Sequence, residues 1–231
     1  MIVTDKYVFI HLHKTGGQFI SQAILNNDSS ARQIGYHYPL SLLPDEFKHL
    51  PEIGFVRNPW DWYVSWYNFN AKRNTGNQVF QVLSDNNTLD FNTVVTRLVN
   101  LGTDEGKVCR EKIIKLLPDT LKNNRGIGLT KQCLTSFDDG FLSWQFNRMF
   151  SVNNVIGNVH FGRLENIRND FTDILNKLNV DITASLKNFI DQTPPINALS
   201  HSKYQSYYDE TLMQLVADKD KEFIKRFNYK Y

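Results

Sequence analysis

The chain has 231 residues, of which 41% are hydrophobic and 22% charged, as in soluble globular proteins that bury one sizeable core. The formal net charge of +2 is too small to indicate a nucleic-acid partner through an overall field, so a basic site would have to be local. Neither a signal-peptide pattern nor an apolar run of roughly 18 residues is present, so we expect a cytoplasmic protein without a membrane span.

The most distinctive stretch lies near the start of the chain, at YVFIHLHKTGGQFI (7–20). Its first four residues are β-branched or aromatic, as in a buried strand, and its last residues open an apolar pattern at helical spacing. Between them stand His13, Lys14, Thr15, Gly16 and Gly17. Glycine lets a ligand approach the backbone, and the first N–H groups of a helix have no partner within the helix. This strand-to-helix turn therefore predicts a phosphate-type anion site.

A second stretch, FVRNPWDWYVSWY (55–67), places an arginine at the end of another predicted strand, 53–57. Pro59 then opens an aromatic helix over 60–70, and Ser65 lies about two turns into it. A guanidinium and a hydroxyl so arranged can hold one phosphate. The simpler interpretations are an ion pair between Arg57 and Asp61 and an ordinary helix serine.

The middle of the chain, residues 71–150, has helical periodicity but no convincing core of its own, so we interpret it as a variable helical and loop insertion. Helices are predicted over 91–101, 111–117 and 139–150, with polar loops at 74–77, 84–88 and 122–128. The remainder predicts a strand over 155–162, helices over 169–178 and 183–191, a loop over 192–203, and one C-terminal helix over 208–227 capped by Asp209.

Strands that alternate with helices predict an α/β fold with a central, mainly parallel sheet flanked by helices, in a single domain over 1–231. Ligands of such sheets bind beyond the carboxyl ends of the strands, where both Lys14 and Arg57 are expected. The two cysteines, Cys109 and Cys133, show no metal-binding spacing, and a disulfide between them stays open.

Together, the two stretches resemble the sulfotransferase family that uses 3′-phosphoadenosine-5′-phosphosulfate (PAPS). FIHLHKTGGQFI is similar to the family's 5′-phosphosulfate loop, and FVRNPWDWYVSWY is similar to its 3′-phosphate element. Their style is nearest to the carbohydrate (heparan/chondroitin-type) sulfotransferases and their bacterial relatives. FGRLENI (161–167) and SHSKY (200–204) are weaker matches, and residues 71–150 have none.

The resemblance implies a P-loop-like fold and in-line transfer of a sulfuryl group from PAPS to an acceptor hydroxyl on a carbohydrate, leaving adenosine 3′,5′-bisphosphate. Lys14 would neutralise the phosphosulfate and the charge that grows on the bridging oxygen. No metal is expected if lysine and N–H dipoles supply this charge. The expected donor contacts are Lys14, Thr15, Gly16, Gly17, Gln18, Phe19, Arg57, Ser65 and Lys203, with Arg57 and Ser65 at the 3′-phosphate.

The acceptor hydroxyl also needs a base, and His37 is the expected one, since members of the family carry a histidine or glutamate between the two phosphate elements. The alternative is that His37 only packs in the aromatic loop around it. Other candidates for the base are His11, His13, Glu46 and Glu52.

Two other classes of function stay open. A nucleotide kinase or NTPase on the same fold is one, although the chain lacks the GxxxxGK[ST] pattern of the usual phosphate loop. A non-catalytic nucleotide- or glycan-binding module is the other.

Overall fold

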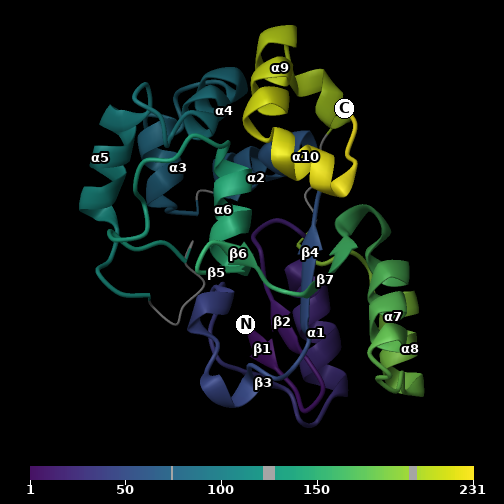
Figure 1. Cartoon of the computed structure of the whole chain (residues 1–231). Helices are drawn as coiled ribbons and strands as arrows, with labels where there is room; N and C mark the ends of the chain where they lie inside the picture. Colours follow the sequence, from purple (N-terminus) through teal and green to yellow (C-terminus); the bar gives the residue numbers. More distant parts are fainter. Residues whose placement is uncertain (74, 122–127, 198–201) are drawn as a thin grey trace. The chain divides into compact units, whose positions relative to one another are not determined.

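The computed structural model in Figure 1 describes residues 1–73, 75–121, 128–197 and 202–231. These residues form two compact units. The first unit comprises 1–57 and 147–197, and the second comprises 58–121, 128–146 and 202–231. The single domain with an insertion at about 71–150 stays a prediction.

The first unit is built on a sheet of five strands in the order β3-β1-β2-β4-β7, counted over the described residues. The strands are β1 (Ile2–Val3), β2 (Val8–Ile10), β3 (Arg32–Gln33), β4 (Glu52–Val56) and β7 (Val159–Arg163). β2, β4 and β7 run parallel, whereas the two-residue strands β1 and β3 pair antiparallel at one edge. The predicted α/β fold with a central, mainly parallel sheet is confirmed, and its likeness to P-loop folds stays a prediction.

Helices α1 (Gly17–Asn27), α7 (Ile167–Lys177) and α8 (Ala184–Gln192) supply apolar side chains to the core of this unit. Because side chains alternate along β4, Ile53 and Phe55 face this core and Gly54 faces the other side, against Phe150. The core consists of Ile2, Tyr7, Phe9, Phe19, Ile20, Ala23, Ile24, Ile53, Phe55, Phe171, Ile174, Leu175, Leu186 and Ile190.

The predicted strand over 155–162 is wrong as one element, because it consists of two strands in different sheets. Val155–Ile156 (β6) turns back on Ser151–Val152 (β5) as a hairpin, and β7 begins only at Val159. Asn153 and Asn154 form the two-residue turn with φ of 51° and 62°. Asparagine tolerates this left-handed region, which hairpin turns of this type require. The remainder of the unit includes short 3₁₀ turns at Leu40–Leu42, Asp45–Phe47 and Leu164–Asn166.

The second unit is helical, and its helices are held by buried polar contacts. It contains α2 (Pro59–Arg73), α3 (Gln78–Leu83), α4 (Phe91–Val99), α5 (Lys107–Leu116), α9 (Glu210–Lys219) and α10 (Lys221–Phe227), with residues 141–146 of α6 (Phe141–Phe150). Asn58 opens α2 by accepting a hydrogen bond from the Trp60 N–H at 3.1 Å. Trp60 and Trp66 are core residues, each 3% exposed, so neither offers a face for stacking on a sugar.

The predicted single helix over 208–227 is also wrong, because Asp220 divides it into α9 and α10. The predicted cap is confirmed: the Asp209 carboxylate accepts a hydrogen bond from the Leu212 N–H at 2.7 Å. Asp220 leaves the helical conformation with φ −101° and ψ 19°, and its buried carboxylate accepts hydrogen bonds from Ser143 and Tyr63. These contacts turn the chain between the two helices.

Cys109 and Cys133 are free thiols, so the disulfide that the sequence left open does not form. Of the helices in the described ranges, none combines the length and the hydropathy needed to cross a membrane. The polar loop predicted at 122–128 lies outside the described residues, except for Gly128.

Candidate functional site

The predicted anion loop connects β2, which ends at Ile10, to α1, which begins at Gly17. The Thr15 hydroxyl donates to the main-chain oxygen of Leu12 at 2.9 Å and so closes the bend. Lys14 has a φ of 61° and Gly16 a φ of 79°, both in the left-handed region. A lysine in this region is strained by about 1–2 kcal/mol, and such strain persists only where the surroundings impose it.

The two glycines of the loop are required for different structural reasons. Gly16 supplies the left-handed backbone just described, which costs glycine almost nothing. At Gly17 a Cβ atom would overlap with the His11 ring, so only glycine lets that imidazole lie against the first turn of α1. Both glycines are thus needed to shape the loop itself.

The start of α1 offers open donors to an anion. The Phe19 N–H donates to the main-chain oxygen of Gly16 at 2.9 Å. Within the described ranges, the N–H groups of Thr15, Gly16, Gly17 and Gln18 donate no hydrogen bond, and no side chain caps the helix. Unpaired N–H groups and the positive end of the helix dipole together favour a negative ligand at this point.

Arg57 reaches this loop from the neighbouring strand. β2 and β4 pair in parallel, with Ile10 opposite Gly54, so their carboxyl ends lie at the same edge of the sheet. Arg57 follows the last residue of β4, and its Nη1 donates to the main-chain oxygen of Lys14 at 3.3 Å. The structure therefore brings the Arg57 side chain to the main chain of Lys14, the two cationic residues that the sequence placed at strand ends.

His37 lies inside a cluster of rings beside the same loop. Its ring stacks on that of His13, with centroids 3.6 Å apart and planes inclined by 18°. The His11 ring lies 4.3 Å away, and the Tyr36 ring meets it edge-on at 4.7 Å. His37 has a φ of 52° and is 7% exposed. Like Lys14, it is thus a non-glycine residue held in the left-handed region.

A hydrogen bond determines which nitrogen of His37 carries the proton. Its Nδ1 lies 2.8 Å from the main-chain oxygen of His11. A carbonyl oxygen can only accept, so Nδ1 donates and Nε2 keeps the lone pair in the neutral ring. This tautomer gives His37 one free acceptor nitrogen, as a general base requires.

Burial opposes a positive charge in this cluster. Burial lowers the pKa of His37 to about 3. The hydrogen bond to the His11 carbonyl opposes this shift by raising the pKa, and the positive charge of Arg148 lowers the pKa further. Burial also lowers the pKa of His11 well below its usual range. Both imidazoles are therefore neutral at pH 7, and His37 in this state is a weak proton acceptor.

Phe19, expected at the donor nucleotide, is 5% exposed and belongs to the core. The Arg168 guanidinium lies over its ring at 5.1 Å, and the Phe189 ring lies 5.5 Å away. Sequence reasoning missed Arg168, because nothing in the local pattern of α7 distinguishes it from a surface arginine. A donor contact of Phe19 stays a prediction.

Ser65 and Lys203 belong to the second unit, whereas Lys14, Arg57 and His37 belong to the first. Ser65 is half-buried on α2. Lys203 is exposed and immediately precedes a 3₁₀ turn, Tyr204–Tyr207, that packs against α2. Ser200 and His201 lie outside the described residues. The roles of Ser65 and Lys203 at the 3′-phosphate stay predictions.

The carboxylate candidates for the base lie elsewhere. Glu52 begins β4 and so lies at the opposite end of that strand from Arg57. Glu46 is part of the 3₁₀ turn Asp45–Phe47. Among the residues that the structure describes, no group of three or more His, Cys, Asp or Glu side chains is arranged to hold a metal ion.

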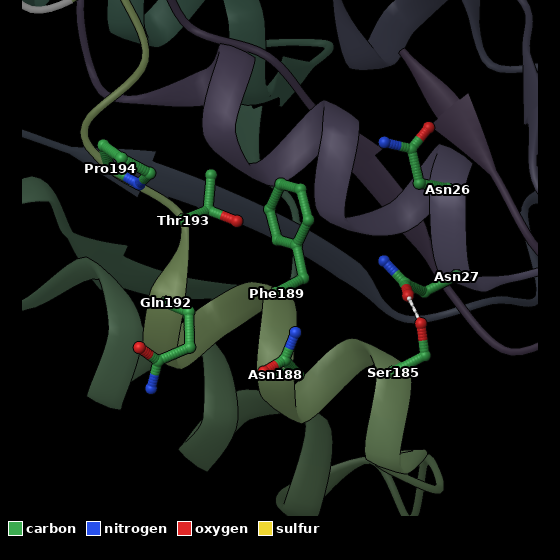
Figure 2. Close-up of a pocket in the computed structure, with 8 residues that line it drawn as sticks. All are labelled: Asn26, Asn27, Ser185, Asn188, Phe189, Gln192, Thr193 and Pro194. Atoms are coloured by element: carbon green, nitrogen blue, oxygen red, sulfur yellow. Dashed lines mark hydrogen bonds between the residues drawn. The ribbon is translucent and has the colours of Figure 1, made fainter.

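A pocket of about 430 Å³ lies at the other end of α1 from the anion loop, between that helix and α8 (Figure 2). Its lining is neutral and rich in amides, and the Ser185 hydroxyl donates to Oδ1 of Asn27 across it at 2.6 Å. The lining residues are Asn26, Asn27, Ser185, Asn188, Phe189, Gln192, Thr193 and Pro194. None of the predicted site residues is among them.

No family model and no curated protein matches the sequence. Among solved structures, the chain is similar to the crystal structure of mouse sulfotransferase SULT7A1 complexed with PAP, with 15% sequence identity and a TM-score of 0.48. The similarity covers 98% of this chain and 86% of that one. A likeness at this level carries no conclusion about activity or ligand.

Proposed function

We propose that the chain is a PAPS-dependent sulfotransferase that moves a sulfuryl group to a hydroxyl of a carbohydrate by in-line displacement. The observation that carries the proposal is the contact between Arg57 and Lys14 at the open start of α1. The Arg57 guanidinium, which follows β4, there contacts the main chain of Lys14 in the loop after the adjacent parallel strand β2. Both residues stand in the sequence context that resembles the two phosphate elements of the family. A nucleotide with phosphate groups at two separate positions needs two such elements.

The residues of the loop fit a phosphosulfate by their chemistry. The N–H groups of residues 15–18 have no acceptor in the described chain, and Lys14 adds a full positive charge beside them. PAPS, when bound, supplies the activated sulfuryl group. In this proposal Lys14 and the N–H groups bind and neutralise its 5′ end, because preorganised donors stabilise charge that develops on oxygen. Arg57, Ser65 and Lys203 are the proposed ligands of the 3′-phosphate.

His37 is the proposed base, accepting the proton of the acceptor hydroxyl at Nε2. Two observations support it: the tautomer that leaves Nε2 free, and the left-handed backbone that His37 shares with Lys14. Non-glycine residues in this region cluster at functional sites, where strain is part of preorganisation. Bound anions raise the pKa of a nearby imidazole, so donor binding is expected to make His37 a stronger base than it is alone.

The donor half is tested by titrating adenosine 3′,5′-bisphosphate into the wild-type protein and the Lys14→Ala variant, with Lys187→Ala as a control. Lys187 is an exposed lysine paired with Asp191, so its loss should leave affinity unchanged. We expect Lys14→Ala to weaken binding at least tenfold, since a hydrogen bond to a charged group contributes about 1.5–3 kcal/mol. Absence of binding to the wild-type protein would refute the proposal.

The acceptor half is tested by incubating the protein with sulfur-35-labelled PAPS and a panel of glycans. Transfer of label to any glycan hydroxyl supports the carbohydrate assignment. Transfer only to phenols or other small alcohols would keep the reaction and overturn the acceptor class. Magnesium-dependent ATP turnover in place of transfer would indicate a kinase or NTPase.

A non-catalytic nucleotide-binding module is the second candidate, and the low pKa of His37 favours it. An imidazole with a pKa of about 3 is a poor proton acceptor at neutral pH. This candidate predicts tight binding of adenosine 3′,5′-bisphosphate that Lys14→Ala weakens, without transfer of label to any acceptor in the panel.

A further inference from the structure

His13 has no role in the function proposed above, yet its ring makes the closest aromatic contact of His37 that the structure describes. It stands directly before Lys14, so it belongs to the anion loop, whereas His37 comes from the segment between β3 and β4. The stack therefore joins the proposed base to the loop that is proposed to hold the donor.

The contacts of His37 constrain its ring in two different ways. The hydrogen bond from Nδ1 to the His11 oxygen fixes one point of the ring and its tautomer. A single hydrogen bond leaves the ring free to tilt, and a tilted ring aligns its Nδ1–H less well with the oxygen, so the bond alone holds the tautomer less firmly. The nearly parallel His13 ring removes this freedom, because tilting would bring the two planes into collision at a centroid distance of 3.6 Å. The two contacts together determine where Nε2 points.

We propose that His13 is a positioning residue: by stacking on His37 it fixes the plane of that imidazole, so that Nε2 keeps one direction relative to Lys14. The inference rests on the proposed function, since it deepens the account of the same site. His13 itself takes no proton in this account, and what it contributes is a flat face of the right size. A phenyl ring at the same position would preserve the face, and a methyl group would not.

The test compares His13→Ala with His13→Phe, using His49→Ala as the control because His49 is exposed and lies outside the cluster. The first readout is the nitrogen-15 NMR spectrum of histidine-labelled protein, in which the His37 signals are assigned by their loss in His37→Asn. The wild-type protein should show the tautomer protonated at Nδ1. His13→Ala should shift the His37 signals toward an average of both tautomers, and His13→Phe and His49→Ala should not.

The second readout is kinetic. We expect His13→Ala to lower kcat by about 10- to 100-fold, with the KM for PAPS changed less than about threefold, because the loss concerns orientation at the reacting atom and not donor binding. His13→Phe should recover most of kcat. A residue with a merely structural role would instead change the melting temperature of both variants and leave the tautomer of His37 as it is.

Two outcomes overturn the inference. One is a His37 spectrum that is unchanged in His13→Ala, and the other is a His13→Phe variant as impaired as His13→Ala in both readouts. Failure of the proposed function is distinguishable from either: the protein would then bind or transfer nothing, while the NMR comparison would still report whether His13 holds His37.

Discussion

Nη1 of Arg57 donates a hydrogen bond to the main-chain oxygen of Lys14 over 3.3 Å. The bond joins the guanidinium to the backbone of the anion loop. Lys14 has a left-handed φ of 61°, and a donor on its carbonyl helps to hold this strained peptide in place. Arg57 thus supports the shape of the loop, whereas its contact with a phosphate is a proposal, and substitutions can separate these two roles.

Arg57→Ala should weaken the binding of adenosine 3′,5′-bisphosphate by about 10- to 100-fold, because a charge-assisted hydrogen bond contributes roughly 1.5–3 kcal/mol. The affinity of Arg57→Lys should lie between those of the wild-type protein and Arg57→Ala, since lysine keeps the charge and loses the planar guanidinium. Calorimetric titration measures both. An exposed arginine, Arg32, provides the control variant Arg32→Ala. Adenosine 5′-monophosphate lacks the 3′-phosphate, so an equal loss of its affinity would show that Arg57 acts through the loop alone.

Lys14 allows charge and backbone strain to be separated. Lys14→Ala and Lys14→Gly both remove the cation, and both should abolish most of the proposed activity. Only glycine relieves the left-handed φ of 61°, so Lys14→Gly should be more stable than Lys14→Ala by about 1 kcal/mol. Chemical denaturation measures the difference. Equal stabilities would mean that the loop relaxes to another conformation when the lysine is lost.

His37 should affect turnover and not donor affinity. His37→Asn suits the left-handed backbone, since asparagine tolerates a φ near 52°, and it removes the imidazole. The kcat of sulfuryl transfer should fall by about 10²- to 10⁴-fold, the usual contribution of a general base. The affinity for PAPS should change less than about threefold. Parallel loss of kcat and affinity, or loss of neither, would transfer the role of base to His13 or to a carboxylate.

The elements that position the site could be predicted because their signals are local. The apolar runs of β2 and β4, the glycines after Lys14 and the proline that opens α2 each act within a few residues of themselves. Parallel pairing of β2 with β4 then brings Lys14 and Arg57 to one edge, as any α/β sheet would. This much of the candidate site follows from short-range chemistry.

What could not be predicted depends on contacts between distant residues. The stack of His13 on His37 requires the left-handed turn at His37, which has no glycine to signal it. Likewise, the sequence predicts α9 and α10 as one helix because the apolar periodicity continues across Asp220. The helix is interrupted there by the hydrogen bonds that Asp220 accepts from Tyr63 and Ser143. The strands β1 and β3 have two residues each, too few for a pattern to be recognised.

The buried histidines predict that acid destabilises the fold. The pKa of His37 is about 3 in the folded protein and about 6.5 in an unfolded chain, so between these values the unfolded state binds more protons. The contribution of neutral His37 to the free energy of unfolding is complete above about pH 6.5. As the pH falls this contribution is lost, by about 2 kcal/mol between pH 7 and pH 5. His11 acts in the same direction. Urea unfolding at several pH values should show a shallower dependence for His37→Asn, and parallel curves would contradict the assignment.

The buried carboxyl of Asp220 has the opposite effect in the second unit, where it predicts that stability falls as the pH rises. Its carboxylate accepts hydrogen bonds from the Ser143 hydroxyl at 2.6 Å, the Ser143 N–H at 2.9 Å and the Tyr63 hydroxyl at 2.8 Å. Burial nevertheless raises its pKa to about 6, against these hydrogen bonds, which lower it. The folded state therefore binds more protons than the unfolded state between about pH 4 and 6. The contribution of Asp220 to the stability of the folded state is therefore greatest below about pH 4 and declines as the pH rises through 6.

Asp220→Asn keeps an oxygen acceptor for Ser143 and places an amide beside Tyr63, whose hydroxyl can also accept. We therefore expect it to fold with stability at pH 8 equal to or above that of the wild-type protein, and to lose the decline between pH 4 and 6. Asp220→Ala leaves the buried hydroxyls of Tyr63 and Ser143 without this partner and should cost about 2–4 kcal/mol at pH 4. The cost should be smaller at pH 8, because the wild-type protein has there lost the stabilisation that the protonated carboxyl contributes. Asp218 is an exposed carboxylate in the last turn of α9, and Asp218→Asn is the control for charge alone. If Asp220→Asn were as damaging as Asp220→Ala at pH 8, the ionised carboxylate itself would hold α9, α10 and α6 together, because an amide that preserves the acceptor oxygen could not replace it.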